Sequence, residues 1–339
     1  MRSMTANPLP ASLNPLGIIE ALDAYQISLS LRGAVELELF THIADGATNV
    51  NEIADRANAS ERGTRILCDF LTVRGFLTKA GNEYGLTPES NAFLNKRSPT
   101  YMGSVALFLA HDYHIDHYRD IAAVVRKGGS LNEGNMGPDD PIWVEFARHM
   151  MPIAMSARTM VPMVAEPGRP MKVLDIAAGP GLYGIFVAQH NPAAEIFATD
   201  WGNVLEVARE NAAKFGVADR YNTIPGSAFE VDFGSGYDLV LLPNFLHHFD
   251  HPTNVTLLKK VRAAMKPGAL LATIETVPNE DRISPPFLAA FSMMMLASTP
   301  AGDAYTFPEL DAMFREAGFG KSELIHLPGS IMPLILTRE

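Results

Sequence analysis

A glycine-rich segment near the middle of the chain has the spacing of a nucleotide-binding loop. Gly179, Gly181 and Gly184 follow the apolar segment 172–176 and satisfy the pattern G-x-G-x-x-G. Such glycines allow a tight turn and a close approach of the backbone to a ligand. Asp200 ends the next apolar segment, at roughly the 20-residue distance at which a carboxylate binds the ribose hydroxyls of a nucleotide. This pattern alone also fits a nicotinamide dinucleotide.

A second carboxylate favours a different ligand. Asp175 lies four residues before Gly179, where it offers nothing to a pyrophosphate but would favour a ligand carrying a sulfonium and an amino group. The loop also follows a helical region, and no separate substrate domain comes after it. The segments 237–242 and 265–271 resemble the fourth and fifth strands of methyltransferases. These features favour S-adenosylmethionine.

Two histidine-rich clusters could do acid–base or metal chemistry. His247, His248 and His251 are close in sequence at a strand-to-helix turn, where neighbouring side chains point in different directions. In the segment 111–117, three histidines at three-residue steps drift around a helix. For both clusters we expect no metal site. The segment 111–117 is predicted to be a polar helix face, with contact to a substrate as the alternative.

Predicted strands and helices, which must position these residues, alternate along the chain after a hinge at 166–170 that is rich in proline and glycine. Such alternation predicts a parallel, doubly wound sheet that binds ligands at the carboxyl ends of its strands. The predicted strands are 173–177, 195–199, 222–225, 237–242, 269–275, 323–326 and 331–336. The predicted helices are 181–190, 203–214, 253–265 and 307–317.

The amino-terminal half has helical periodicity. Apolar residues recur at three- and four-residue steps over 15–45, as in a helix buried on several sides of a dimer or in a plain core helix. Helix starts at Asn49 and Ser60, followed by a hairpin over 76–87, resemble a winged helix. The helix 61–74 has no basic stripe, which favours a dimerisation scaffold over DNA binding.

Composition limits the remaining possibilities. The 339 residues allow two domains, and 47% apolar with 19% charged residues is typical of a globular chain. The net charge of −11 argues against nucleic-acid binding. A single cysteine, Cys68, fits a reducing compartment. Met1–Asn14 lacks the apolar run of a signal peptide, and 286–297 is too short to span a membrane. We therefore expect a cytoplasmic protein that does not bind membranes.

The stretch 173–275, together with the amino-terminal layout, resembles the caffeic-acid and hydroxyindole type O-methyltransferases and their bacterial relatives in secondary metabolism. The resemblance implies an α/β fold in which a helical dimerisation domain (1–165), with a winged-helix-like segment at about 35–97, precedes a Rossmann-like methyltransferase domain (170–339). The second domain would hold a doubly wound, mostly parallel seven-stranded sheet. A homodimer is also implied.

The resemblance also assigns cofactor contacts. They fall on Asp175, Gly179, Gly181, Asp200, Trp201, Ser227, Ala228, Phe229 and Asn244. Two positions depart from the family pattern. Ser227 stands where the family has an acidic residue against adenine, and Pro243 replaces a common lysine.

The same comparison places the catalytic residues. His247 matches the family's general base, and Glu275 matches the carboxylate that orients it; imidazole titrates near neutral pH and suits this role. A second family glutamate falls at Ala304, so Asp303 could replace it. His248 replaces a family aspartate. The acceptor pocket is predicted to be apolar and to contain Phe146, Met150, Phe291, Met294, Met295 and Thr299.

The sequence therefore predicts a metal-independent O-methyltransferase that acts on a hydroxyl of an apolar, aromatic small molecule. The departures at 248 and 304 leave C-methylation or non-methylating chemistry open as alternatives. A winged-helix regulator that senses the cofactor is a third hypothesis, against which the acidic charge argues.

Overall fold

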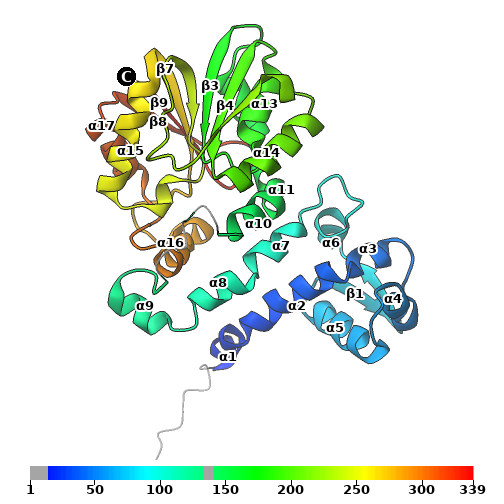
Figure 1. Cartoon of the computed structure of the whole chain (residues 1–339). Helices are drawn as coiled ribbons and strands as arrows, with labels where there is room; N and C mark the ends of the chain where they lie inside the picture. Colours follow the sequence, from blue (N-terminus) through cyan, green and yellow to red (C-terminus); the bar gives the residue numbers. More distant parts are fainter. Residues whose placement is uncertain (1–13, 133–136, 138–139, 339) are drawn as a thin grey trace, which may run out of the picture. The chain divides into compact units, whose positions relative to one another are not determined.

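A computed structural model describes residues 14–132, 137 and 140–338 (Figure 1). The expectation about a signal peptide therefore concerns residues almost wholly outside this part of the chain. The chain forms two compact units, Met1–Ala110 and His111–Glu339. No helix in the described ranges is long and apolar enough to cross a membrane.

The first unit contains seven helices and one hairpin within its described residues. They are α1 (Leu16–Leu22), α2 (Ala24–Glu36), α3 (Leu39–Ala44), α4 (Val50–Arg56), α5 (Glu61–Val73), β1 (Leu77–Ala80), β2 (Glu83–Leu86), α6 (Pro88–Phe93) and α7 (Ser104–Leu109). The expected helix starts are present, since the Asn49 and Ser60 side chains accept hydrogen bonds from Glu52 N and Gly63 N. The hairpin pairs Leu77 with Leu86, as the winged-helix prediction required.

The apolar periodicity of 15–45 does not produce one helix. It is divided among α1, α2 and α3, and Glu38 has a left-handed φ of 53° at the second break. None of the residues of α1 is buried within this chain. Its large apolar side chains are exposed, notably Leu16, Ile18, Ile19 and Leu22.

The second unit contains the sheet. Its strands are β3 (Met171–Ile176), β4 (Ala194–Asp200), β5 (Tyr221–Pro225), β6 (Tyr237–Leu241), β7 (Met265–Ile274), β8 (Lys321–Ile325) and β9 (Leu334–Arg338). They lie in the order β5-β4-β3-β6-β7-β9-β8. The first five are parallel, whereas β9 pairs antiparallel with both β7 and β8. The predicted seven-stranded, mostly parallel sheet is confirmed.

Helices cover both faces of this sheet, as a doubly wound fold requires (Figure 1). The helices around the sheet are α13 (Leu182–His190), α14 (Gly202–Lys214), α15 (His251–Ala264) and α17 (Phe307–Glu316). Side chains alternate along β3. Val173 packs in one core with Ile185 of α13, whereas Leu174 packs in the other with Leu258 of α15 and Phe314 of α17.

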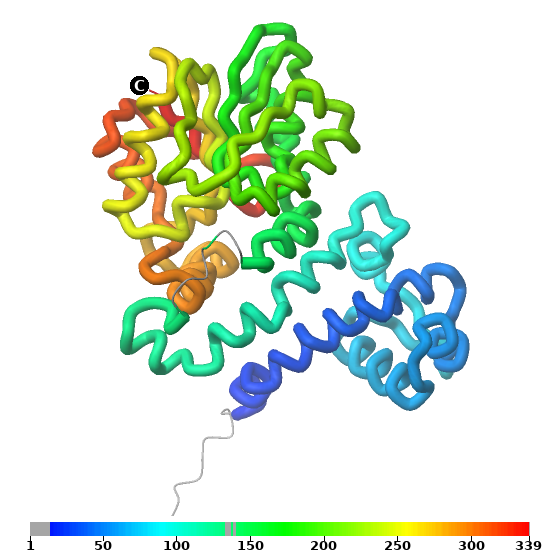
Figure 2. The backbone as a smooth tube through the Cα atoms, in the orientation of Figure 1, coloured from blue at the N-terminus to red at the C-terminus, as the bar shows by residue number. Residues whose placement is uncertain are grey.

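The second unit contains six further helices within its described residues. They are α8 (Asp112–His117), α9 (Ile121–Lys127), α10 (Ile142–His149), α11 (Met151–Ala154), α12 (Val161–Val164) and α16 (Pro286–Ser298). Three short 3₁₀ helices complete the unit, at Met155–Thr159, Ala218–Arg220 and Leu246–His248. Although far apart in sequence, α16 packs against α8 and α9 (Figure 2). Residues 111–165 thus belong to the compact unit of the sheet, whereas the sequence hinge at 166–170 lies later.

Candidate active site

The glycine loop between β3 and α13 is built for close packing. Gly181 has a φ of +77°, and a Cβ atom there would lie 2.5 Å from the hydroxyl of Tyr221. The Asn211 side chain donates to Pro180 O at 2.9 Å and fixes the turn. Only glycine fits position 181 without strain and overlap. The loop therefore has the tight, glycine-dependent backbone that a nucleotide-binding loop requires.

Asp200 lies at the carboxyl end of β4 and is held by the backbone on both sides. Its Oδ2 accepts from Gly179 N at 2.8 Å, and its Oδ1 accepts from Trp201 N at 2.7 Å. Burial raises the pKa of Asp200 to about 6, although these two hydrogen bonds oppose the rise. The carboxylate thus lies beside the glycine loop, in the position expected for a ribose contact.

Asp175 lies beneath the loop rather than at its surface. The residue is fully buried, and its Oδ2 accepts from Gly184 N at 2.9 Å. Within the described part of the chain, Oδ1 has no hydrogen-bond partner. Burial, with a contribution from Asp200, raises the pKa of Asp175 to about 8. An orphaned buried carboxylate oxygen behind the loop suits a cationic ligand, because a positive charge would offset the burial.

The predicted adenine end is formed by residues after β5. Ser227 accepts from Phe229 N at 3.2 Å, so its hydroxyl stabilises the local turn. Ala228 is buried next to it. Phe229 packs edge-to-face against Phe249, with ring centroids 4.9 Å apart. Asn244 has a left-handed φ of 51° and donates to the Tyr183 hydroxyl at 3.4 Å.

His247 and Glu275 form a buried pair at the carboxyl edge of the sheet. Glu275 follows β7, His247 follows β6, and the two side chains are 2% and 7% exposed. Nδ1 of His247 lies 2.7 Å from Oε2 of Glu275. Because an ionised carboxylate only accepts, Nδ1 carries the proton and Nε2 is left as the basic nitrogen.

The other oxygen of Glu275 holds the backbone that carries the histidine. Oε1 accepts from the N–H groups of Phe245, Leu246 and His247 at 2.9, 2.8 and 3.4 Å. A carboxylate that receives several N–H groups fixes both its own position and that of the turn. One side chain thus orients the imidazole and the chain around it.

The loop after α16 supports His247 from the other side. Asp303 N donates to His247 O at 3.0 Å, and a Cβ atom at Gly302 would lie only 2.2 Å from the same oxygen. The Asp303 carboxylate instead binds Arg282 at 3.3 Å and Ala304 N at 2.8 Å. It therefore does not take the place of the second family glutamate beside the base.

The predicted acceptor residues lie on α10, on α16 and just after these helices. Phe291 packs edge-to-face on His247, with ring centroids 4.9 Å apart. Phe146 lies against the glycine loop, 3.5 Å from where a Cβ atom at Gly179 would be. Thr299 is buried, and its hydroxyl binds Met295 O and Gly302 N, so it serves the loop. The remaining predicted side chains lie in the same region: Met295 is buried, whereas Met150 and Met294 are half-buried.

Trp143 is a site residue that the sequence analysis missed. It lies on α10 beside Phe146 and meets the ring of His248 edge-on, with centroids 5.6 Å apart. No motif marks this tryptophan, because its neighbour in space is more than 100 residues away in sequence. Only the folded arrangement brings the two rings together.

The histidines of 111–117 have local structural roles. Nδ1 of His111 accepts a hydrogen bond from Tyr113 N at 3.2 Å, so His111 caps the N-terminus of α8. The buried His117 has its Nδ1 2.5 Å from Tyr113 O. Burial lowers the pKa of His114 to about 4. Among the described residues, no group of three or more His, Cys, Asp or Glu could hold a metal ion.

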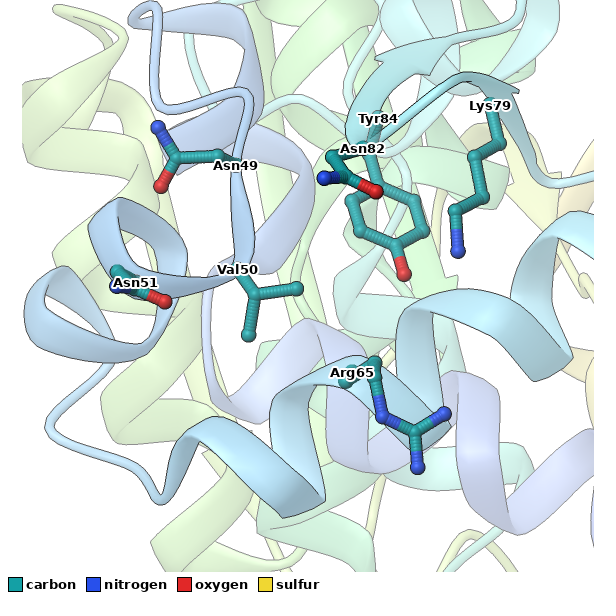
Figure 3. Close-up of a pocket in the computed structure, with 7 residues that line it drawn as sticks. All are labelled: Asn49, Val50, Asn51, Arg65, Lys79, Asn82 and Tyr84. Carbon is teal, nitrogen blue, oxygen red and sulfur yellow. The ribbon is translucent and has the colours of Figure 1, made fainter.

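A polar pocket in the first unit bears on the DNA-binding alternative (Figure 3). Arg65 of α5 and Lys79 of the hairpin line it, together with Tyr84. All three bind Asp69, at 3.0, 2.5 and 2.7 Å. Asp69 pairs with both cations and offsets one of their two charges, so Arg65 and Lys79 are already engaged within the unit and do not form a stripe of free cations for a phosphate backbone.

Comparison with known proteins agrees with this geometry. Residues 165–320 match the O-methyltransferase domain, and residues 19–96 match the O-methyltransferase dimerisation domain. The structure of a candidate O-methyltransferase from Nostoc punctiforme is 47% identical in sequence. The match covers 97% of this chain and 100% of that chain, with a TM-score of 0.93.

Two curated relatives are more distant. The S-adenosyl-L-methionine-dependent methyl transferase PigF of Serratia sp. is 25% identical over 89% of this chain and 90% of its own length. The 3-hydroxy-5-methyl-1-naphthoate 3-O-methyltransferase of Streptomyces sahachiroi is 26% identical over 85% of each chain. The protein belongs to the O-methyltransferase family that carries a dimerisation domain, and it is a methyltransferase that uses S-adenosylmethionine.

Proposed function

We propose that this enzyme transfers the methyl group of S-adenosylmethionine to a hydroxyl of a mostly apolar, aromatic small molecule, with His247 as the general base. The observation that carries the proposal is the buried 2.7 Å contact between His247 Nδ1 and Glu275 Oε2. It directs the basic Nε2 away from the carboxylate and toward a bound acceptor.

The loop residues would hold the methyl donor. Asp200 would bind the ribose, Gly179 and Gly181 would allow the close approach of the backbone, and the charge of Asp175 would favour the cationic centre. Trp201, Ser227, Ala228, Phe229 and Asn244 would complete this site. The bound donor supplies a methyl group on a sulfonium, which is already a good leaving group.

The chain's own residues would then position the acceptor and remove its proton. Nε2 of His247 takes the proton of the acceptor hydroxyl, while the oxygen forms its bond to the methyl carbon and the carbon–sulfur electron pair leaves with sulfur. Glu275 stabilises the resulting imidazolium. Because neither a Lewis acid nor an activated water is needed for this step, we propose a metal-independent reaction.

An aromatic acceptor follows from the surroundings of the base. The edge-to-face contact of Phe291 with His247 and the methionines of α16 give the site apolar, polarizable walls. A flat ring system suits such walls. The Streptomyces relative, whose name states a hydroxynaphthoate acceptor, supports the same class.

We also propose a homodimer that lies within the cytoplasm. The match to a dimerisation domain and the exposed apolar face of α1 both support the homodimer. An exposed face of this kind is best covered by a second copy of the chain. Light scattering after size exclusion tests this, because L22E together with I18E should convert the dimer to a monomer.

Methyl transfer is tested by incubation with labelled S-adenosylmethionine and a panel of phenols, enols and aliphatic alcohols. The proposal expects label on an oxygen of an aromatic member, and H247A should lose this activity while still binding the cofactor. Label on carbon would favour the C-methylation alternative.

A further inference from the structure

Among the residues that the structure describes, two buried ring nitrogens beside the base have no hydrogen-bond partner. Nδ1 of His248 and Nε1 of Trp143 are both inaccessible to solvent, and neither makes a hydrogen bond within the described part of the chain. The two rings meet edge-on with centroids 5.6 Å apart at 87°. Both ring nitrogens therefore belong to one small buried region in which they lack hydrogen bonds from the described residues.

Leaving such groups unsatisfied is costly. An unpaired buried donor or acceptor loses its hydration without compensation, and native proteins contain few of them. The other rings around His248 are aromatic, namely those of His247, Phe245 and Phe249. Within the described part of the chain none of these rings hydrogen-bonds to Nδ1 of His248, so a bound ligand is the candidate partner.

We propose that His248 and Trp143 together recognise a second oxygen of the acceptor, a hydroxyl or carbonyl adjacent to the hydroxyl that is methylated. This inference rests on the proposed O-methyl transfer and narrows its substrate class to aromatic compounds with neighbouring oxygen substituents.

The position of His248 favours the acceptor over the cofactor. Its ring lies 4.3 Å from that of His247, centroid to centroid, and His247 in turn packs on Phe291 of the apolar wall. For an acceptor whose hydroxyl reaches Nε2 of His247, the adjacent imidazole of His248 would be a neighbouring polar side chain. The ribose contact at Asp200 belongs to a different strand.

The chemistry of the two groups suits an oxygen. The indole N–H only donates, whereas a neutral imidazole nitrogen either donates or accepts, according to the tautomer. Burial, reinforced by His247, lowers the pKa of His248 well below its usual value, so the ring stays neutral at physiological pH. A hydroxyl can satisfy both rings, and a carbonyl oxygen can accept from both.

The test uses pairs of compounds that differ by one oxygen: phenol with catechol, and 2-naphthol with 2,3-dihydroxynaphthalene. Binding to the full-length enzyme saturated with S-adenosylhomocysteine is measured by calorimetry for wild type, H248F and W143F. H251F is the matched control, because His251 is an exposed histidine that pairs with Glu316. Wild type and H251F should prefer the dihydroxy member by about tenfold. Each site variant should reduce this preference to about threefold or less.

Thermal unfolding of the ligand-free variants separates recognition from a structural role. Replacing an unsatisfied polar ring by an apolar one should leave the melting temperature unchanged or raise it. A lower melting temperature for both H248F and W143F would overturn the proposal, since it would mean that the nitrogens support the fold. A weaker affinity for S-adenosylhomocysteine alone would overturn it in favour of a cofactor contact.

The inference is also overturned if H248F and W143F both keep the wild-type preference for the dihydroxy compounds, or if no probe binds. Methylation of 2-naphthol by wild type with labelled cofactor is scored separately. If wild type methylates 2-naphthol while the variants keep the wild-type preference for the dihydroxy compounds, only the role of His248 and Trp143 is refuted. If wild type methylates no phenol, enol or alcohol on oxygen, the proposed function is refuted.

Discussion

Glu275 holds His247 twice, once through the imidazole and once through the backbone. Oε2 lies 2.7 Å from Nδ1, while Oε1 accepts from three successive N–H groups that include that of His247. The orientation of the base and the shape of its turn therefore depend on one carboxylate.

Two substitutions of Glu275 should separate these contributions. E275Q keeps an amide oxygen for the N–H groups of residues 245–247 but loses the charge opposite the imidazole and the acceptor of Thr276 N, so kcat should fall by about 10²-fold or more with a smaller loss of stability than in E275A. E275A also leaves buried N–H groups unsatisfied and should destabilise the protein by about 1–3 kcal/mol. Steady-state kinetics and denaturant unfolding of both variants measure the effects. Equal stability loss in the two variants would contradict this division.

Gly302 should control the position of the base. A methyl group there would overlap the carbonyl oxygen of His247, so G302A must displace one of the two segments. A displacement of the order of 1 Å can cost about 10²-fold in rate. We expect a lower kcat with unchanged affinity for S-adenosylhomocysteine. G202A is the control, since a Cβ atom there meets no atom within 4 Å; a similar loss in both variants would refute the positional explanation.

Cofactor binding should weaken in acid because of Asp200. Burial raises its pKa to about 6, and the ionised form is the better acceptor for ribose hydroxyls. The dissociation constant should therefore rise below pH 6, by up to about tenfold per pH unit if only the ionised form binds. D200N should bind weakly and should lack the additional rise in the dissociation constant below pH 6, whereas the ionisation of Asp175 near pH 8 affects both proteins. Calorimetry between pH 5 and 8 measures both curves, and parallel curves would contradict the assignment.

Asp175 should make the ligand-free protein less stable at high pH. Its pKa rises from an ordinary 3.8 to about 8, so folding favours the protonated form. The stability contributed by this group is greatest below the unfolded pKa and falls as the pH rises toward 8. D175N removes the ionisation and should raise the melting temperature more at pH 9 than at pH 5. An equal rise in the melting temperature at the two pH values would contradict the raised pKa of Asp175.

The sequence predicted the local elements well, because their signals are local. The caps at Asn49 and Ser60 are both present, and α17 begins at the predicted residue 307. The alternation of strands and helices after residue 170 also yields the predicted sheet. In each case the residues near in sequence determine where a helix or strand forms, through capping hydrogen bonds and the periodicity of apolar residues.

The contacts that complete the site could not be read in the same way. The sequence raised Asp303 as a substitute for a missing glutamate, but Arg282, 21 residues away, binds its carboxylate. The meeting of Trp143 with His248 depends on the placement of α10 against the carboxyl edge of the sheet. The break at Glu38 requires a left-handed residue that the apolar period does not reveal.

The proposed reaction depends on removal of the acceptor hydroxyl proton by His247. Single-turnover transfer of a ¹³C-methyl group from S-adenosylmethionine to a responsive phenol, followed by NMR in wild type and H247A, tests it most directly. We expect an O–CH₃ signal in wild type and a rate lower by about 10²- to 10⁴-fold in H247A at equal cofactor occupancy. An O–CH₃ product formed at the same rate by both proteins would contradict it.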